Sequence, residues 1–253
     1  MDKNKLINIY TIIITIITVA AIIVGVTRIF GTGGIFKFNN KEIFTVGESE
    51  SDSETIACAD FDNIKVDVEV SDVIIEPGDS YQVSYEYHTS NGRTVAPEVK
   101  VEGNTLKVTQ TIKPKVNAGI NSQDCKIVIT VPAKATLKDV DLSSDVGDIE
   151  VNAINTNTIT IQSDVGDVSF DTINADSIKT TSDVGDVSIQ NSTITSVDAT
   201  SGVGEIYIKD TTTSDVKAES GVGDITLKNV YDANGNEPKL DIEAGVGDKE
   251  INK

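Results

Sequence analysis

Pairs of aspartates recur around single glycines in the second half of the chain, at a spacing that suits cation binding or proton transfer. The segments SDVGDIEV, SDVGDVSF and SDVGDVSI begin at residues 144, 163 and 182, an interval of 19 residues. Each supplies one carboxylate two residues before its glycine and one directly after it. Clustered carboxylate oxygens are ligands for Ca²⁺ in extracellular modules. A weak calcium site is therefore one hypothesis for Asp145, Asp148, Asp164, Asp167, Asp183 and Asp186.

A turn explains the same residues without a metal. Glycine supplies a positive φ, and aspartate accepts hydrogen bonds from nearby backbone N–H groups, so both residue types are common in turns. The nine-residue period of calcium-binding β-rolls is absent. We favour the structural interpretation, because a repeat that is copied along the chain copies its turn.

Catalysis is the least supported interpretation of the paired acids. Acid–base catalysis by two carboxylates requires different environments for the two groups, whereas this pair recurs with no unique copy. The sequence contains no phosphate-binding loop, nucleophile elbow or zinc-protease motif. Its one histidine, His88, has no evident catalytic partner. We predict no catalytic residues, no cofactor and no enzymatic activity.

The elements that position these acids follow from the period itself. The glycines are spaced by 19 residues four times and by 24 once, and the extra residues fall in 229–239, which we expect to form an outward loop. A fixed period of this length predicts a solenoid. Its predicted turn residues are Gly147, Gly166, Gly185, Gly204, Gly223 and Gly247.

Apolar residues keep fixed offsets from each glycine, so each coil should contain two short strands with alternate side chains inward. We expect six coils over 139–253, with Lys249 as a polar cap on the last, since terminal repeats need a polar end. A small residue stands three before each glycine, where a tight inward corner is predicted. These residues are Ser144, Ser163, Ser182, Ser201, Ser220 and Ala244.

Residues 55–138 show period-two alternation and turn signals, as in NIKVDVEV at 63–70. We predict a β-rich, sandwich-like half that precedes the coils, so that 55–253 forms one all-β domain. Cys58 and Cys125 could form a disulfide outside the cytoplasm. The alternative is that Cys125 is a buried free thiol.

The N-terminal region has a different composition. No charged side chain occurs from Leu6 to Thr27, a length that suits a helix crossing a bilayer. We predict a single-pass membrane anchor at residues 1–30; a cleaved signal peptide and a buried helix are the alternatives. The acidic stretch that ends at 54 predicts a flexible linker over 31–54. The short leading segment and the acidic β-rich remainder favour a cell-membrane protein with an extracytoplasmic β domain.

The chain of 253 residues carries a formal net charge of −19. This argues against nucleic acid as a partner, because phosphate binding requires a basic face. Outward positions such as Thr158, Thr160 and Gln162 on one strand, and Lys179 and Thr181 on the next, predict flat polar ladders. Such ladders suit contact with a protein, a glycan or a wall polymer.

The segment KIVITVPAKATLKDVDLSSDVGDIEV, residues 126–151, resembles the bacterial "putative adhesin" domain, also called toast-rack. The resemblance covers roughly residues 56–252, and it rests on a strand ending in Val-Pro that leads into S-x-x-G-D-I repeats. It implies a stacked β-helix-like rack in an envelope-associated protein, with no established catalytic residues. Members of the family occur near systems that respond to cell-envelope stress.

The sequence thus predicts a membrane-anchored extracytoplasmic β-solenoid that acts by binding. One alternative is a regulatory module that senses envelope stress through a membrane partner. A further alternative is a weak calcium-dependent adhesin. The oligomeric state is left open.

Overall fold

A computed structural model of the chain describes residues 50–90, 93–94, 96–111 and 125–252. They belong to one compact unit, Glu48–Lys253. The predicted anchor at 1–30 and most of the predicted linker lie outside the described residues. Within the described ranges, no helix has the length and apolar character needed to span a bilayer.

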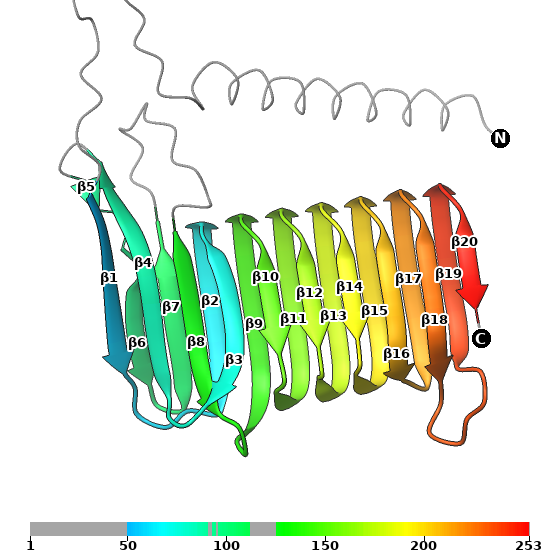
Figure 1. Cartoon of the computed structure of the whole chain (residues 1–253), viewed down its shortest axis with the longest axis horizontal. Coiled ribbons are helices and arrows are strands. Elements are labelled where there is room, and N and C mark those ends of the chain that lie inside the picture. The colour runs from blue at the N-terminus through cyan, green and yellow to red at the C-terminus, as the bar shows by residue number, and fades with distance from the viewer. Residues whose placement is uncertain (1–49, 91–92, 95, 112–124, 253) are drawn as a thin grey trace, which may run out of the picture. The chain divides into compact units, whose positions relative to one another are not determined.

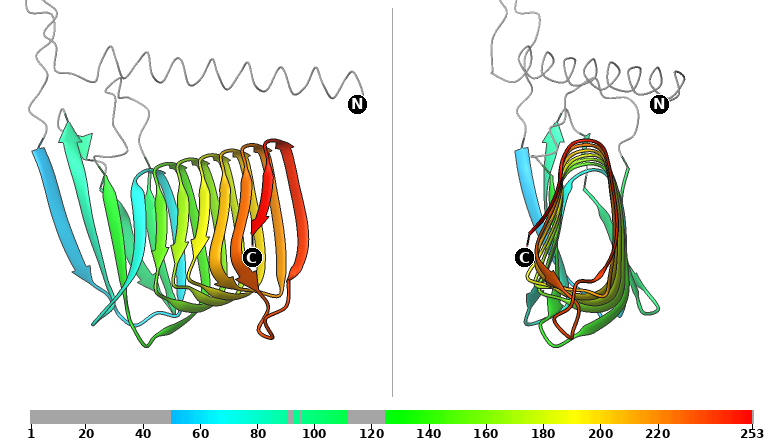
Figure 2. Two further views of the ribbon diagram at one scale, coloured as in Figure 1. Left: turned by 45° about the vertical axis from the view of Figure 1, so that its right-hand side comes forward. Right: turned by 90° about the vertical axis from the view of Figure 1, so that its right-hand side faces the viewer.

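The repeats form a solenoid with two walls of parallel strands (Figure 1). The long-strand wall contains β9 (Thr136–Val146), β11 (Asn155–Val165), β13 (Asn174–Val184), β15 (Thr193–Val203), β17 (Asp215–Val222) and β19 (Lys239–Val246). The short-strand wall contains β10 (Ile149–Asn152), β12 (Val168–Asp171), β14 (Val187–Gln190), β16 (Ile206–Thr212), β18 (Ile225–Tyr231) and β20 (Lys249–Asn252). Viewed along its axis, this unit is a flattened ring in which each coil overlies the next (Figure 2).

The register between coils equals the sequence period. Ile159 of β11 pairs with Ile178 of β13, and Val168 of β12 pairs with Val187 of β14. Equivalent side chains therefore stack in columns along the axis, as the 19-residue spacing predicts. The six-coil, all-β solenoid expected over 139–253 is what the structure shows.

An additional coil precedes the six predicted ones. It contains β2 (Asn63–Val70) and β3 (Asp72–Gly78), which pair in parallel with β9 and β10. Val70 pairs with Val146, so that Ser71 occupies the place of Gly147. The predicted sandwich-like character of residues 55–138 is therefore corrected over β2 and β3, which continue the solenoid. This coil has serine where the others have the turn glycine, so the glycine spacing does not indicate it.

The chain then doubles back to build the N-terminal end. β7 (Thr105–Gln110) pairs in parallel with β2, and β8 (Lys126–Pro132) pairs in parallel with β3. The outer strands are antiparallel: β6 (Glu98–Glu102) on β7, β4 (Gln82–Ser90) on β8, β5 (Arg93–Thr94) on β4, and β1 (Glu50–Ala57) on β4.

Strand β1 also corrects the predicted linker boundary. Residues 50–54 were expected to be flexible, yet they pair with β4, where Glu54 faces Tyr85. The Tyr85 hydroxyl donates a hydrogen bond to Glu54 Oε2 at 2.6 Å. The acidic run is thus held as a strand because each of its residues from Glu50 to Glu54 pairs with a residue of β4.

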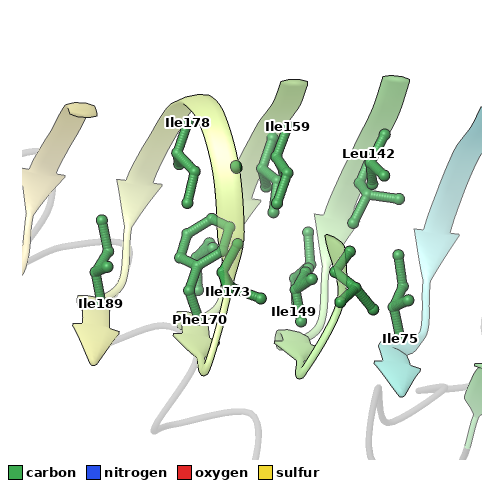
Figure 3. Close-up of a cluster of buried hydrophobic side chains, with 14 of the residues drawn as sticks. Ile75, Leu142, Ile149, Ile159, Phe170, Ile173, Ile178 and Ile189 are labelled. Carbon is green, nitrogen blue, oxygen red and sulfur yellow. The ribbon is translucent and has the colours of Figure 1, made fainter. Parts of the chain in front are cut away.

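The core is a stack of aliphatic side chains between the walls (Figure 3). Ile149, Ile159 and Ile189 are buried, and Phe170 is the largest of the fully buried side chains. Burial of each such side chain contributes about 1.5–3 kcal/mol. The last coil is less covered, since Ile251 is 51% exposed.

Candidate functional site

The first corner of each coil contains the predicted turn glycines. Their φ angles lie between +140° and +157°, a region that side chains disfavour. A Cβ at Gly185 would overlap the carbonyl oxygen of Gly166, one coil back, and the other five meet the same obstacle. Glycine is therefore required both by conformation and by the close approach of successive backbones.

The acids directly after the glycines form a ladder of hydrogen bonds. Asp167 N–H donates to Asp148 Oδ1 at 2.9 Å, and Asp186 N–H donates to Asp167 Oδ1 at 2.8 Å. Asp72, in the unpredicted first coil, accepts from Asp148 N–H at 3.0 Å. Burial, more than any other factor, raises the pKa of Asp72. These carboxylates thus join one coil to the next.

The acids two before the glycines, Asp145, Asp164 and Asp183, are exposed on the other side of this corner. Burial, followed by the negative charge of Asp164, raises the pKa of Asp145. In the part of the chain that the structure describes, no three potential ligands are grouped closely enough to hold a metal ion. The structure therefore brings the six predicted calcium ligands to one corner but does not assemble them into a site.

The five serines three before the glycines are buried at this corner, and four of them donate hydrogen bonds to backbone carbonyls, whereas Ser144 Oγ is buried without a hydrogen-bond partner among the described residues. Ser201 Oγ donates to the Gly185 carbonyl at 2.9 Å, and Ser220 Oγ donates to the Gly204 carbonyl at 3.0 Å. A small residue therefore fits the space at this corner, and serine adds a hydrogen bond to backbone in four of the coils.

The valines directly before the glycines form an exposed column. Val146, Val165, Val184 and Val246 are between 37% and 49% exposed. Val165 pairs in register with Val146 on one side and with Val184 on the other, and Val246 pairs with Val222 further along the corner. In the first three of the six predicted coils each valine stands in the sequence between an aspartate and the turn glycine that precedes the second aspartate.

A second corner was not predicted, because no glycine marks it. One residue in each of five coils has a left-handed backbone, with φ between +48° and +58°. Asparagine and aspartate tolerate this conformation better than other non-glycine residues. The residues are Ala153, Thr172, Asn191, Asp210 and Asn229. Their spacing of 19 residues, together with Asn or Asp at three of the five positions, could have indicated this second corner.

A groove of about 290 Å³ lies along this second corner. We call it the corner groove; its lining comprises Ala153, Ile154, Asn155, Thr172, Ile173, Asn174, Asn191 and Thr193. Asn174 Nδ2 donates to Asn155 Oδ1 at 3.2 Å. Asn191 Nδ2 donates to Asp171 Oδ1 at 2.6 Å. The amides are thereby held in fixed orientations at the surface.

A smaller cavity, of about 20 Å³, lies among the last coils between Leu227, Tyr231 and Leu240. It has room for about one water molecule.

The outward ladders on the long-strand wall are partly occupied by internal contacts. Thr158 Oγ1 donates to Asp139 Oδ1 at 2.6 Å. Asp198 lies within 3.7 Å of Lys179 Nζ and 3.6 Å of Lys217 Nζ. This wall therefore satisfies part of its own polar groups.

The disulfide hypothesis for Cys58 and Cys125 is wrong in this structure, where the two residues form no disulfide. Cys58 N–H bonds to Tyr81 at one end of β4, whereas Cys125 precedes Lys126, which pairs with Glu86 toward the other end. Five residues along a strand span about 17 Å, well beyond the Cα separation of about 7 Å that a disulfide allows. Cys125 is buried, as the alternative to the disulfide expects.

A family model and a solved structure are similar to this chain over most of the described residues. The family model described as Toastrack DUF4097 matches residues 61–252. A crystal structure of a "putative adhesin" from Bacteroides fragilis has a TM-score of 0.50 and 20% identity, covering 81% of this chain and 97% of its own. A "putative cell adhesion protein" from Clostridium sporogenes has a TM-score of 0.48 and 20% identity, covering 81% and 99%. The comparison with curated proteins found no match.

Proposed function

The chain belongs to the Toastrack DUF4097 family, and from this premise we propose that it is a non-catalytic, adhesin-like binding module of the bacterial cell envelope. In this proposal the apolar segment at 6–27 anchors the chain in the cell membrane. The solenoid then stands outside the cytoplasm and presents its outer surface to an envelope component.

The observation that carries the proposal is the corner groove. It is the larger of the two cavities described above, and it is open and lined by oriented amides and hydroxyls. Binding sites use a few well-placed polar groups for orientation and specificity. The repeat presents such groups again in each coil, which suits a ligand that is itself extended.

The name of the Bacteroides fragilis protein is compatible with this proposal but does not carry it. At 20% identity the likeness concerns the fold. Adhesion is proposed here because the chain offers a repeated polar surface on a filled core. The calcium-dependent alternative is not proposed, since the acids after the glycines already bind backbone N–H groups.

The test uses the full-length protein in detergent, mixed with purified peptidoglycan sacculi that retain their wall polymers. We expect the protein to sediment with the sacculi. Photo-crosslinking in the native membrane provides the opposing outcome. A single membrane-protein partner, with no retention on sacculi, would replace the adhesin-like role with regulation through that partner.

A further inference from the structure

The corner groove is part of a longer column of residues in register. Asn155 pairs with Asn174, Asn174 with Thr193, Thr193 with Thr212, and Thr212 with Tyr231. Four steps between coils, each about 4.8 Å, give a length of about 19 Å. A ligand that follows the column must therefore be long and narrow.

The first part of this column has unused hydrogen-bonding capacity. An asparagine side chain offers two N–H donors and a carbonyl oxygen with two lone pairs. The bond from Asn174 to Asn155 engages one donor and one lone pair. Asn174 and Thr193 are exposed and Asn155 is half-buried, so their remaining groups can reach a ligand. The matching ligand carries hydroxyl or amide groups at regular intervals.

The charge of the groove selects among polar ligands. Of the described residues, those that line it carry amide, hydroxyl or aliphatic side chains. The nearby Asp171 binds Asn191 through one oxygen and Thr172 through the other, at 2.6 and 3.1 Å. An anionic polymer would be repelled by a chain of net charge −19. A cationic polymer would be attracted to the first corner, where the acids beside the turn glycines lie, and not to the corner groove.

The column ends on an aromatic residue. Tyr231 is half-buried, and its ring combines an apolar face with a polar hydroxyl. Such a ring suits the apolar face of a sugar, while the amides suit its hydroxyl and acetamido groups. The register places the backbone of Tyr231 in line with Asn155 and Asn174, and the residue also lines the small cavity near Leu227.

We propose that the corner groove and the column from Asn155 to Tyr231 bind a neutral glycan chain, which lies along the solenoid axis. This inference rests on the proposed binding function and names its ligand class. Neutral amides and hydroxyls recognise the sugar hydroxyls, and Tyr231 packs against a ring at one end.

Isothermal titration calorimetry of the full-length protein tests this proposal with two neutral probes, chitohexaose and cellohexaose, and with anionic hyaluronan oligosaccharides. We expect at least one neutral probe to bind, with an affinity that salt does not change. Asn155→Ala combined with Asn174→Ala should weaken binding about tenfold or more, through lost hydrogen bonds. Tyr231→Ala should weaken it, and Tyr231→Phe should retain it.

The matched control is Asn157→Ala, which removes an exposed asparagine on the same strand, outside the groove lining. Wild-type affinity in this control, with loss in the double variant, supports the site. Equal affinity of the double variant and wild type would overturn it, as would preferential, salt-sensitive binding of hyaluronan. Retention on sacculi without binding of either neutral probe would overturn the glycan site and leave the proposed function standing. Failure of both tests would remove both.

Discussion

Asp148 Oδ1 accepts a hydrogen bond from the backbone N–H of Asp167, 19 residues later in the chain and one coil further along the axis, at 2.9 Å. Asp148, Asp167 and Asp186 are each used twice: the backbone N–H donates to the preceding coil and the side chain accepts from the next one. This explains why an acid follows every turn glycine without reference to a ligand. In one coil Glu205 stands where the others have aspartate. Its backbone N–H still donates to Asp186 Oδ1 at 2.7 Å.

Asp167→Ala should destabilise the solenoid by about 1–3 kcal/mol, because it leaves Asp186 N–H without its charged acceptor. Asp167→Asn should cost less, since the amide oxygen can still accept. The measurement is urea unfolding followed by circular dichroism. Asp164→Ala, which removes an exposed acid three residues earlier, should stay within about 0.5 kcal/mol of wild type. Equal losses in the two alanine variants would contradict the ladder.

Removal of calcium should leave the melting temperature unchanged. The acids after the glycines are engaged with backbone, and the acids before them are exposed without a third ligand in the described residues. Differential scanning fluorimetry with chelator and with millimolar Ca²⁺ tests this expectation. A calcium-dependent rise that disappears in Asp164→Asn combined with Asp183→Asn would restore the calcium hypothesis.

Gly185→Ala should prevent or severely weaken folding, because the new Cβ meets the Gly166 carbonyl and φ is +152°. Gly235 provides the comparison. It also has a positive φ, +78°, but a Cβ there meets nothing within 4 Å. Gly235→Ala should therefore cost only about 1–2 kcal/mol, the cost of a left-handed residue. Similar unfolding midpoints for both variants would show that the stacked backbones can separate.

The period of the sequence predicts the coils because stacking in register makes every coil obey the same constraints. Gly147 and its equivalents mark the first corner through steric necessity, which a single sequence reveals. The second corner escaped prediction because its left-handed residues vary from Ala153 to Asn191, and no one residue type is required. The candidate site lies at this corner, so sequence alone did not locate it.

The N-terminal half escaped prediction for a different reason. Strand β2 lies between β7 and β9, both later in the chain, so its neighbours depend on long-range pairing. Alternation identified the strands but not their order. The similarity of Val70-Ser71-Asp72 to Val146-Gly147-Asp148 could have revealed the additional coil. Serine in place of the turn glycine weakens that similarity.

Stability should fall as pH rises above 10, and Tyr85 should contribute to this fall. Burial, and then the hydrogen bond to Glu54, raise the pKa of Tyr85 from 10.0 to about 12. Between these values the unfolded chain releases the phenolic proton while the folded chain retains it, so unfolding is favoured. Tyr85→Phe has no proton to lose. Urea midpoints at pH 9 and pH 11 should therefore diverge less in Tyr85→Phe than in wild type.

Replacement of Lys249 at the open C-terminal end of the solenoid should cause the protein to self-associate. Lys249 occupies the position that is isoleucine in the preceding coil, and its Nζ donates to the Ile242 carbonyl at 2.6 Å. Charge at an edge strand opposes pairing with another chain. Lys249→Ile would extend the apolar stack and remove that charge, beside the half-exposed Ile251. We expect concentration-dependent self-association by analytical ultracentrifugation.

Lys228→Ile makes the same chemical change at an exposed position of the preceding coil. If both variants associate equally, general hydrophobicity and not the open end is responsible; if neither associates, β19 and β20 are protected by something other than Lys249.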